Sequence, residues 1–115
     1  MEVFAANADR EKQLVDALKQ GKQSAFEDLY DHYAPSFYGE IKRNFYKEDV
    51  SAQTLQQVFQ NIGVSISSYD PSRERLFTWG IRIVRKEIRK QKTELVLKEL
   101  FYCRQSNPVV AGKTG

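Results

Sequence analysis

Residues Tyr69–Lys92 read YDPSRERLFTWGIRIVRKEIRKQK, and this stretch decides how the rest of the chain is interpreted. From residue 73 to residue 92 there are eight basic residues and two acidic ones, a net charge of +6 in a chain whose total is +3. Most of the basic residues follow Phe77 and Trp79 on a segment with helical periodicity. A basic helix face with aromatic side chains at its start is typical of surfaces that bind a nucleic-acid strand and stack on exposed bases.

At 100° per residue, this helix divides into two faces. Ile81, Val84, Ile88 and Leu95 lie within about 60° of one another and predict the face that packs on a core. Trp79 falls at the edge of the opposite face. Two interpretations stay open here: a solvated helix with Trp79 at the core boundary, or a strand-binding face with an exposed indole. The opposite face, called the basic arc below, consists of Arg82, Arg85, Lys86, Arg89, Lys90 and Lys92.

Three further segments carry apolar residues at helical spacing. The first has a cap at Asn7 or Asp9 and ends at Gly21, and the second has a cap at Ser24 and continues to about residue 45. Pro35 should kink or divide this second helix. A third helix is expected from about residue 50 to residue 66. The fourth starts near residues 73–77, passes residue 92, and gives way after residue 104 to an unanchored tail. The sequence therefore predicts an all-α fold, a compact bundle of about four helices.

The remaining composition excludes several classes of function. A length of 115 residues allows one domain, and no apolar run is long enough to enter a membrane as a spanning segment. There is no secretory signal, and the single cysteine, Cys103, cannot form an internal disulfide, which favours a cytoplasmic location. His32 is the only histidine and has no second ligand at metal-binding spacing. With no phosphate loop or nucleophile motif either, the sequence predicts no metal, no cofactor and no enzymatic activity.

Three pieces of the chain carry a family resemblance. They are AFEDLYDHYAPSFYGEIKRNF from Ala25, SAQTLQQVF from Ser51, and SYDPSRERLFTWGIRIVR from Ser68. In this order they resemble region 2 of bacterial RNA polymerase sigma factors of the extracytoplasmic-function type, whose pattern is AFE-x-LYD-x-Y, QEVF, DP-x-x-G, F-x-x-W and R-I-A-R-N. The resemblance covers roughly residues 9–92. It implies a region 2-like helical domain over residues 1–92, followed by a helix extension and flexible tail over residues 93–115.

The resemblance also implies two working surfaces. In that family, the helix holding QEVF docks on the clamp helices of the polymerase β′ subunit, and the following loop and basic helix hold the non-template strand of the promoter −10 element. Core RNA polymerase and promoter DNA are therefore the expected partners, with an anti-sigma factor as a further one. The polymerase-facing candidates are Gln53, Gln56, Gln57 and Gln60. The DNA-facing candidates are Tyr69, Asp70, Arg73, Arg75, Phe77, Trp79, Arg82, Arg85, Lys86 and Arg89. In this interpretation the loop over residues 69–75 forms a pocket for a flipped base, and Trp79 stacks where the duplex ends.

The chain departs from the family pattern at several positions, among them Lys86 in place of the asparagine of R-N and Gly80 in place of a usual leucine. The acidic residues that usually precede QEVF are replaced by Val50, Ser51, Ala52 and Gln53, and Glu74 stands where the turn glycine is expected. Only 23 residues follow Lys92, fewer than a helix-turn-helix domain that reads the −35 element would need. These departures keep two alternatives open: a degenerate sigma-like interaction module, held by an anti-sigma factor or acting as a decoy without promoter recognition, and a small helical bundle with a solvated basic helix.

Overall fold

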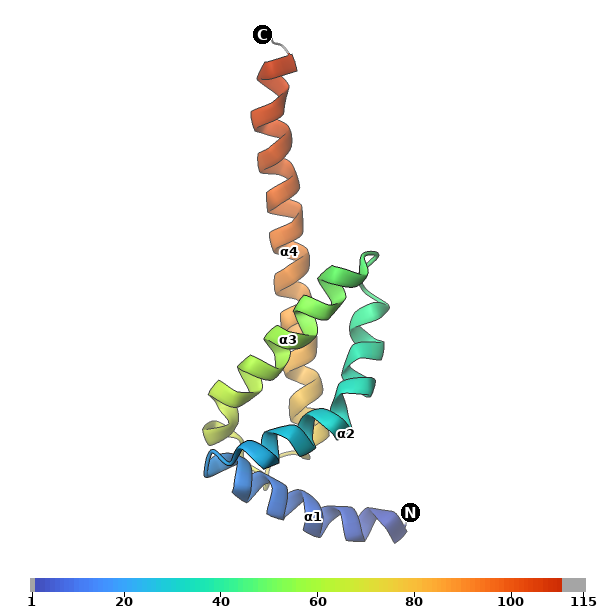
Figure 1. The fold of residues 1–115 in the computed structure, drawn as a ribbon, viewed down its shortest axis with the longest axis vertical. Coiled ribbons are helices and arrows are strands. Elements are labelled where there is room, and N and C mark those ends of the chain that lie inside the picture. Colours follow the sequence, from blue (N-terminus) through green and yellow to red (C-terminus); the bar gives the residue numbers. More distant parts are fainter. Residues whose placement is uncertain (1, 111–115) are drawn as a thin grey trace.

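The protein is built from helices throughout the part that the structure describes. The computed structural model describes residues 2–110, with side chains described for residues 9–101. No strand occurs within that range, so the predicted all-α fold of about four helices is confirmed (Figure 1). The elements are α1 (Glu2–Lys19), α2 (Gln23–Lys42), α3 (Glu48–Ser65), a short 3-10 turn η1 (Ile66–Ser68) and α4 (Leu76–Val110).

The connection between α1 and α2 depends on Gly21. Its φ of 79° lies in the left-handed region, where an L-residue with a side chain is strained. The Gly21 amide donates to the Leu18 carbonyl at 3.0 Å, and the Lys22 amide donates to the Ala17 carbonyl at 3.1 Å, the two bonds of a Schellman motif. The predicted end of the first helix is therefore confirmed.

Two predicted helix starts were wrong. Helix α1 begins at Glu2, so Asn7 and Asp9 lie within it rather than at its cap. Helix α2 begins one residue before Ser24, at Gln23, and its cap position, Lys22, makes no side-chain capping bond. The Gly21 turn already delivers the chain into helical geometry, so α2 starts without the capping serine that the sequence pattern indicated.

Pro35 bends α2 without dividing it. The proline lies inside one continuous helix from Gln23 to Lys42, although its ring removes a backbone donor and crowds the preceding turn. Figure 1 shows that the two halves of α2 run in clearly different directions. The bend lets the first half of α2 lie beside α1 while the second half runs toward the connection to α3 (Figure 1). The predicted kink is confirmed.

Helix α4 is much longer than the rest of the helical bundle, called the body below, against which it packs. Its first half lies against α3 and α2, and its second half projects beyond them (Figure 1). The projection explains the radius of gyration of 19.1 Å, well above the ~13 Å expected for a compact chain of this length. The helix continues to Val110, six residues beyond the point where the tail was predicted to begin, and residues 111–115 lie outside the described range. No helix in residues 2–110 is both long and apolar enough to cross a membrane.

The core lies where α2, α3 and the first half of α4 meet. Phe37 is fully buried at its centre, with ring centroids 5.6–5.7 Å from those of Tyr33, Phe59 and Phe77. The packing at this point is so close that a Cβ on Gly80 of α4 would stand 2.7 Å from the Phe37 ring. The predicted apolar face of α4 is buried at Val84 and Ile88 and half-buried at Ile81, whereas Leu95 is exposed because α4 has left the body by that point.

Candidate nucleic-acid and protein interfaces

The basic arc lies on the solvent side of α4, and two of its arginines form ion pairs. The Arg82 guanidinium bonds to both carboxylate oxygens of Glu74, which raises the pKa of Arg82. The Arg85 Nε lies 3.7 Å from Oε2 of Glu40 on α2. Both arginine side chains are about 60% exposed, at 62% and 59%. Ion pairs this exposed stabilise a fold by little, so a phosphate group can compete for either arginine.

Three cations of the basic arc make no ion pair with any residue that the structure describes. Lys86, Arg89 and Lys90 are all exposed, while Lys92 donates from its ammonium group to the Asn44 side-chain oxygen at 3.0 Å. Because positions 86, 89 and 90 lie on one helix face, and Glu87 is buried on another, their charges add in a small area with no exposed carboxylate between them. This middle part of the basic arc is the most favourable place on α4 for a polyanion.

Trp79 is a core residue, and its predicted role in base stacking needs correction. Only 7% of its surface is exposed, and its ring packs on that of Tyr69 with a centroid separation of 5.0 Å. The helical angle of Trp79 does place it near the basic arc, but the loop before α4 folds back over the first turn and covers this position. In this conformation the indole supports the loop and has no face open to a base.

The loop predicted to hold a flipped base is closed around Tyr69. This side chain is 2% exposed, its hydroxyl donates to the Glu74 carbonyl at 2.8 Å, and its own carbonyl accepts from the Lys19 ammonium at 2.7 Å. Asp70 accepts from the Ser72 hydroxyl at 2.7 Å and the Ser72 amide at 2.9 Å, and these bonds lower the pKa of Asp70. Tyr69 thus stabilises the loop from its buried side, while Asp70 stabilises it from the surface, with 51% of its side chain exposed. Of this loop Arg73 is the most exposed predicted DNA contact, at 82% of its side chain.

Glu11 holds the start of α4 and was missed by the sequence analysis. Its Oε2 accepts from the backbone amide of Leu76 at 2.8 Å, and its Oε1 accepts from the Arg75 guanidinium at 3.2 Å. A carboxylate at a helix N-terminus satisfies a free amide and interacts favourably with the helix dipole. Because the carboxylate comes from α1, 65 residues earlier in the chain, no local capping pattern indicates it. Arg75, a predicted DNA contact, is thus held against α1.

The closed loop makes the protein's stability sensitive to alkaline pH. Burial, followed by the nearby Glu11 carboxylate, raises the pKa of Tyr69 to about 12 from an ordinary value of 10.0. The folded state therefore holds this proton more tightly than the unfolded state, and its contribution to stability is complete below pH 10 and lost as the pH rises toward 12. We expect the free energy of unfolding to fall by about 2 kcal/mol over this window through Tyr69. Urea titrations at several pH values measure the effect, and the Tyr69→Phe variant should lose that part of the pH dependence; an unchanged dependence in the variant would contradict the assignment.

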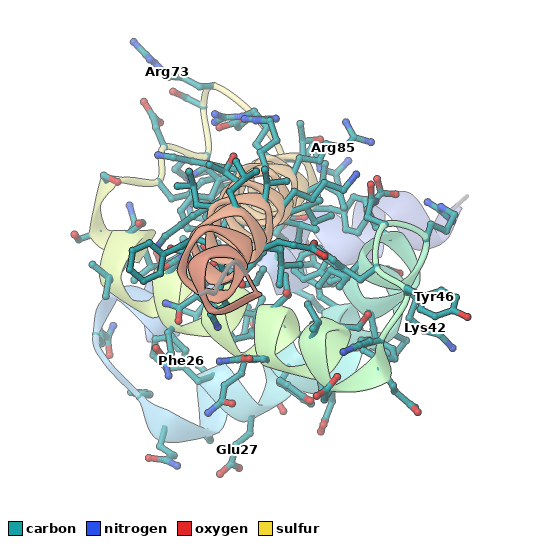
Figure 2. The ribbon with its side chains drawn as sticks, turned by 90° about the horizontal axis from the view of Figure 1, so that it is seen from above. Phe26, Glu27, Lys42, Tyr46, Arg73 and Arg85 are labelled. Atoms are coloured by element: carbon teal, nitrogen blue, oxygen red, sulfur yellow. The ribbon has the colours of Figure 1, made fainter. Side chains whose placement is uncertain are left out.

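A second surface lies on the other side of the molecule, between α2 and α3. Figure 2 shows Phe26 and Glu27 of α2 on the side opposite Arg73 and Arg85. Here Tyr30, 47% exposed, packs on Phe59 at a centroid distance of 4.8 Å. The walls of this groove, called the α2–α3 groove below, are mostly apolar, with acidic residues on the α2 side. It is lined by Phe26, Glu27, Tyr30, Asp31, Ala34, Pro35, Tyr38, Ala52, Leu55, Gln56, Phe59 and Gln60.

The four glutamines expected to face the polymerase do not act as one set. Gln56 and Gln60 line the α2–α3 groove, and Gln53 is exposed on α3. Gln57 instead is half-buried and donates to the side-chain oxygen of Asn61 at 3.4 Å, and Asn61 in turn bonds to Glu87 of α4. The structure therefore brings three of the predicted residues to the surface and places Gln57 in the contact between helices.

Gln57 belongs to a polar cluster that joins α3 to α4. Its centre is Glu87, only 2% exposed, whose two oxygens accept from Asn61 at 2.9 Å and from Gln91 at 2.8 Å. A buried carboxylate is costly unless both of its oxygens are bonded, and here both are. Glu87 could not be singled out from the sequence, because an acidic residue within a basic helix is usually an ordinary surface residue.

The comparisons with known proteins add no relative. No family model matches the chain, and neither a curated protein nor a solved structure matches it.

Proposed function

We propose that this protein is a transcription-initiation module of the sigma region 2 type, which docks on core RNA polymerase and holds a melted promoter strand. The observation that carries the proposal is the separation of two surfaces. The first two quoted sequence pieces contribute nearly all residues of the α2–α3 groove, and the basic arc, which begins at the end of the third piece with Arg82 and Arg85, lies on the opposite side (Figure 2). A module with two such surfaces can hold a protein and a nucleic-acid strand at the same time.

The strand would bind along the middle of α4. Lys86, Arg89 and Lys90 neutralise phosphates, and the exposed side chains of Arg82 and Arg85 exchange their weak ion pairs for the strand. These contacts are insensitive to sequence and strongly dependent on salt. Phe77 is 41% exposed at the start of the helix, which leaves part of its ring open to a base. Trp79 and Tyr69 take part only by supporting the loop.

The polymerase would bind in the α2–α3 groove. Apolar grooves between helices commonly receive a helix from a partner, with the apolar floor supplying affinity and the polar rim supplying orientation. The exposed ring of Tyr30 would serve as the aromatic anchor residue of this interface, and Gln56 and Gln60 would form hydrogen bonds beside it.

Co-purification with core RNA polymerase tests the proposal. The wild-type chain is expected to be retained by the polymerase, and Tyr30→Glu to be retained at least about tenfold less, because it places a charge in the apolar groove. Tyr46→Glu is the matched control, since Tyr46 is a fully exposed tyrosine outside the groove. No retention of the wild type, or equal loss in both variants, would contradict docking through this groove.

One alternative is favoured by a specific observation. The burial of Trp79 and Tyr69 removes the two aromatic side chains that a promoter reader was expected to expose. A degenerate module that is held by an anti-sigma factor, or that acts as a decoy, would need the α2–α3 groove but no strand-binding face. Such a module would bind its protein partner through the groove and would not bind a labelled single strand at physiological salt.

A further inference from the structure

The projecting part of α4 exposes apolar side chains that no other described residue covers. Beyond residue 92 the helix has no neighbouring helix among residues 2–110 (Figure 1). Four large apolar side chains there are more than half exposed, which is costly for a surface in water and unusual for side chains that lie this close together. They are called the apolar stripe below: Val96, Leu97, Leu100 and Phe101.

The apolar stripe continues the face of the basic arc. At 100° per residue, its four members span about 140° of the helix, in line with Arg85, Arg89 and Lys90. Leu95 points elsewhere, in line with the buried Val84 and Ile88. One face of α4 is therefore basic beside the body and apolar beyond it. This face is turned away from α2 and α3, so a second helix can lie along it without meeting the body.

We propose that a second copy of this chain covers the apolar stripe, with the two α4 helices antiparallel. A parallel pair would place the basic arcs of both copies against each other, which is unfavourable between like charges. An antiparallel pair sends the two basic arcs toward opposite ends. The projecting segment itself is nearly neutral, since Lys92 and Lys98 are balanced by Glu94 and Glu99.

The antiparallel arrangement also has a self-consistent register. When Leu97 faces Leu100 of the second copy, Val96 faces Phe101 of that copy. Because the pair is symmetric, each of these two contacts forms twice, and all four side chains of the apolar stripe are covered in both copies. Each copy then buries about 400 Å² of the stripe, and with flanking side-chain stems the interface reaches roughly 1,000 Å² in total. This area is at the low end for specific association, so the expected dimer is weak and forms at tens to hundreds of micromolar.

Sedimentation velocity of the full chain over about 1–500 µM tests the proposal. The wild type is expected to shift from monomer to dimer, and Val96→Glu combined with Leu100→Glu to stay monomeric over the whole range. Leu95→Glu introduces a single glutamate outside the stripe and should dimerise like the wild type. Far-UV circular dichroism checks that both variants keep their helices. A wild type that remains monomeric at every concentration means that something other than a second copy covers the stripe, and the proposal is then wrong.

Cross-linking tests the direction of the two helices. In a Cys103→Ser background, chains carrying Val96→Cys and chains carrying Phe101→Cys are oxidised separately and as a mixture. Antiparallel helices bring position 96 of one copy to position 101 of the other, so the mixture should link several-fold faster than either variant alone. Faster linking of each variant with itself would show parallel helices and overturn the arrangement. Neither experiment involves polymerase or DNA, so its result does not depend on the proposed function.

Discussion

Replacing Trp79 with alanine is expected to lower the free energy of unfolding by about 3–5 kcal/mol, as for other large aromatic side chains removed from a core. The indole is buried between the loop and α4, and its removal leaves Tyr69 without the ring on which it packs. Urea unfolding followed by far-UV circular dichroism measures the loss; tryptophan fluorescence cannot, because Trp79 is the only tryptophan. Phe77→Ala is the comparison, and it should cost less because Phe77 is 41% exposed.

The same variant separates a structural role for Trp79 from a role in binding. If the indole only supports the loop, Trp79→Ala that is still folded at low temperature should bind a single strand within a few-fold of the wild type. A Trp79→Ala protein with wild-type stability and no strand affinity would show that the burial seen here is lost when the strand binds, and that the sequence-based hypothesis of stacking was right.

Changing Lys86 and Arg89 together to glutamate is expected to reduce affinity for a labelled single strand by about 100-fold at 0.1 M salt. Both side chains are exposed and make no ion pair with a described residue, so each is available to a phosphate. Each phosphate contact that is lost should also reduce the slope of log affinity against log salt by about 0.7. Fluorescence anisotropy across a salt series measures both quantities.

A matched control separates the basic arc from net charge. Lys12 and Lys22 are exposed and lie outside α4, and changing both to glutamate alters the net charge by the same amount. This control should keep most of the strand affinity. An equal loss in the two double variants would mean that the strand responds to the charge of the whole chain, and the basic arc would then not be a binding site.

The helices could be predicted because apolar periodicity depends only on local spacing. Apolar periodicity predicted that Val84 and Ile88 lie on the core face of α4, and Gly21 predicted the end of α1. The errors lie at helix ends, where tertiary contacts or neighbouring geometry replace local signals. Ser24 does not cap α2 because the turn at Gly21 already sets the direction of the chain.

The candidate site was predicted less completely, for a related reason. A helical angle describes where a side chain points on its own helix and not what lies over it, so the covering of Trp79 by Tyr69 was not visible. The contacts from Glu11 and Lys19 to the loop join residues at least 50 positions apart. The exposed cations of the basic arc could be predicted from helical angles alone, because no other part of the described structure covers them.

The central proposal for the function is that the basic arc holds an unpaired strand. Its most direct test compares the affinity of the wild-type chain for an A·T-rich single strand and for the matched duplex, by anisotropy at one salt concentration. We expect the single strand to bind about tenfold more tightly, because a stacking contact of ~1–3 kcal/mol at Phe77 is available only to unpaired bases. Equal affinities, or tighter binding of the duplex, would contradict the claim.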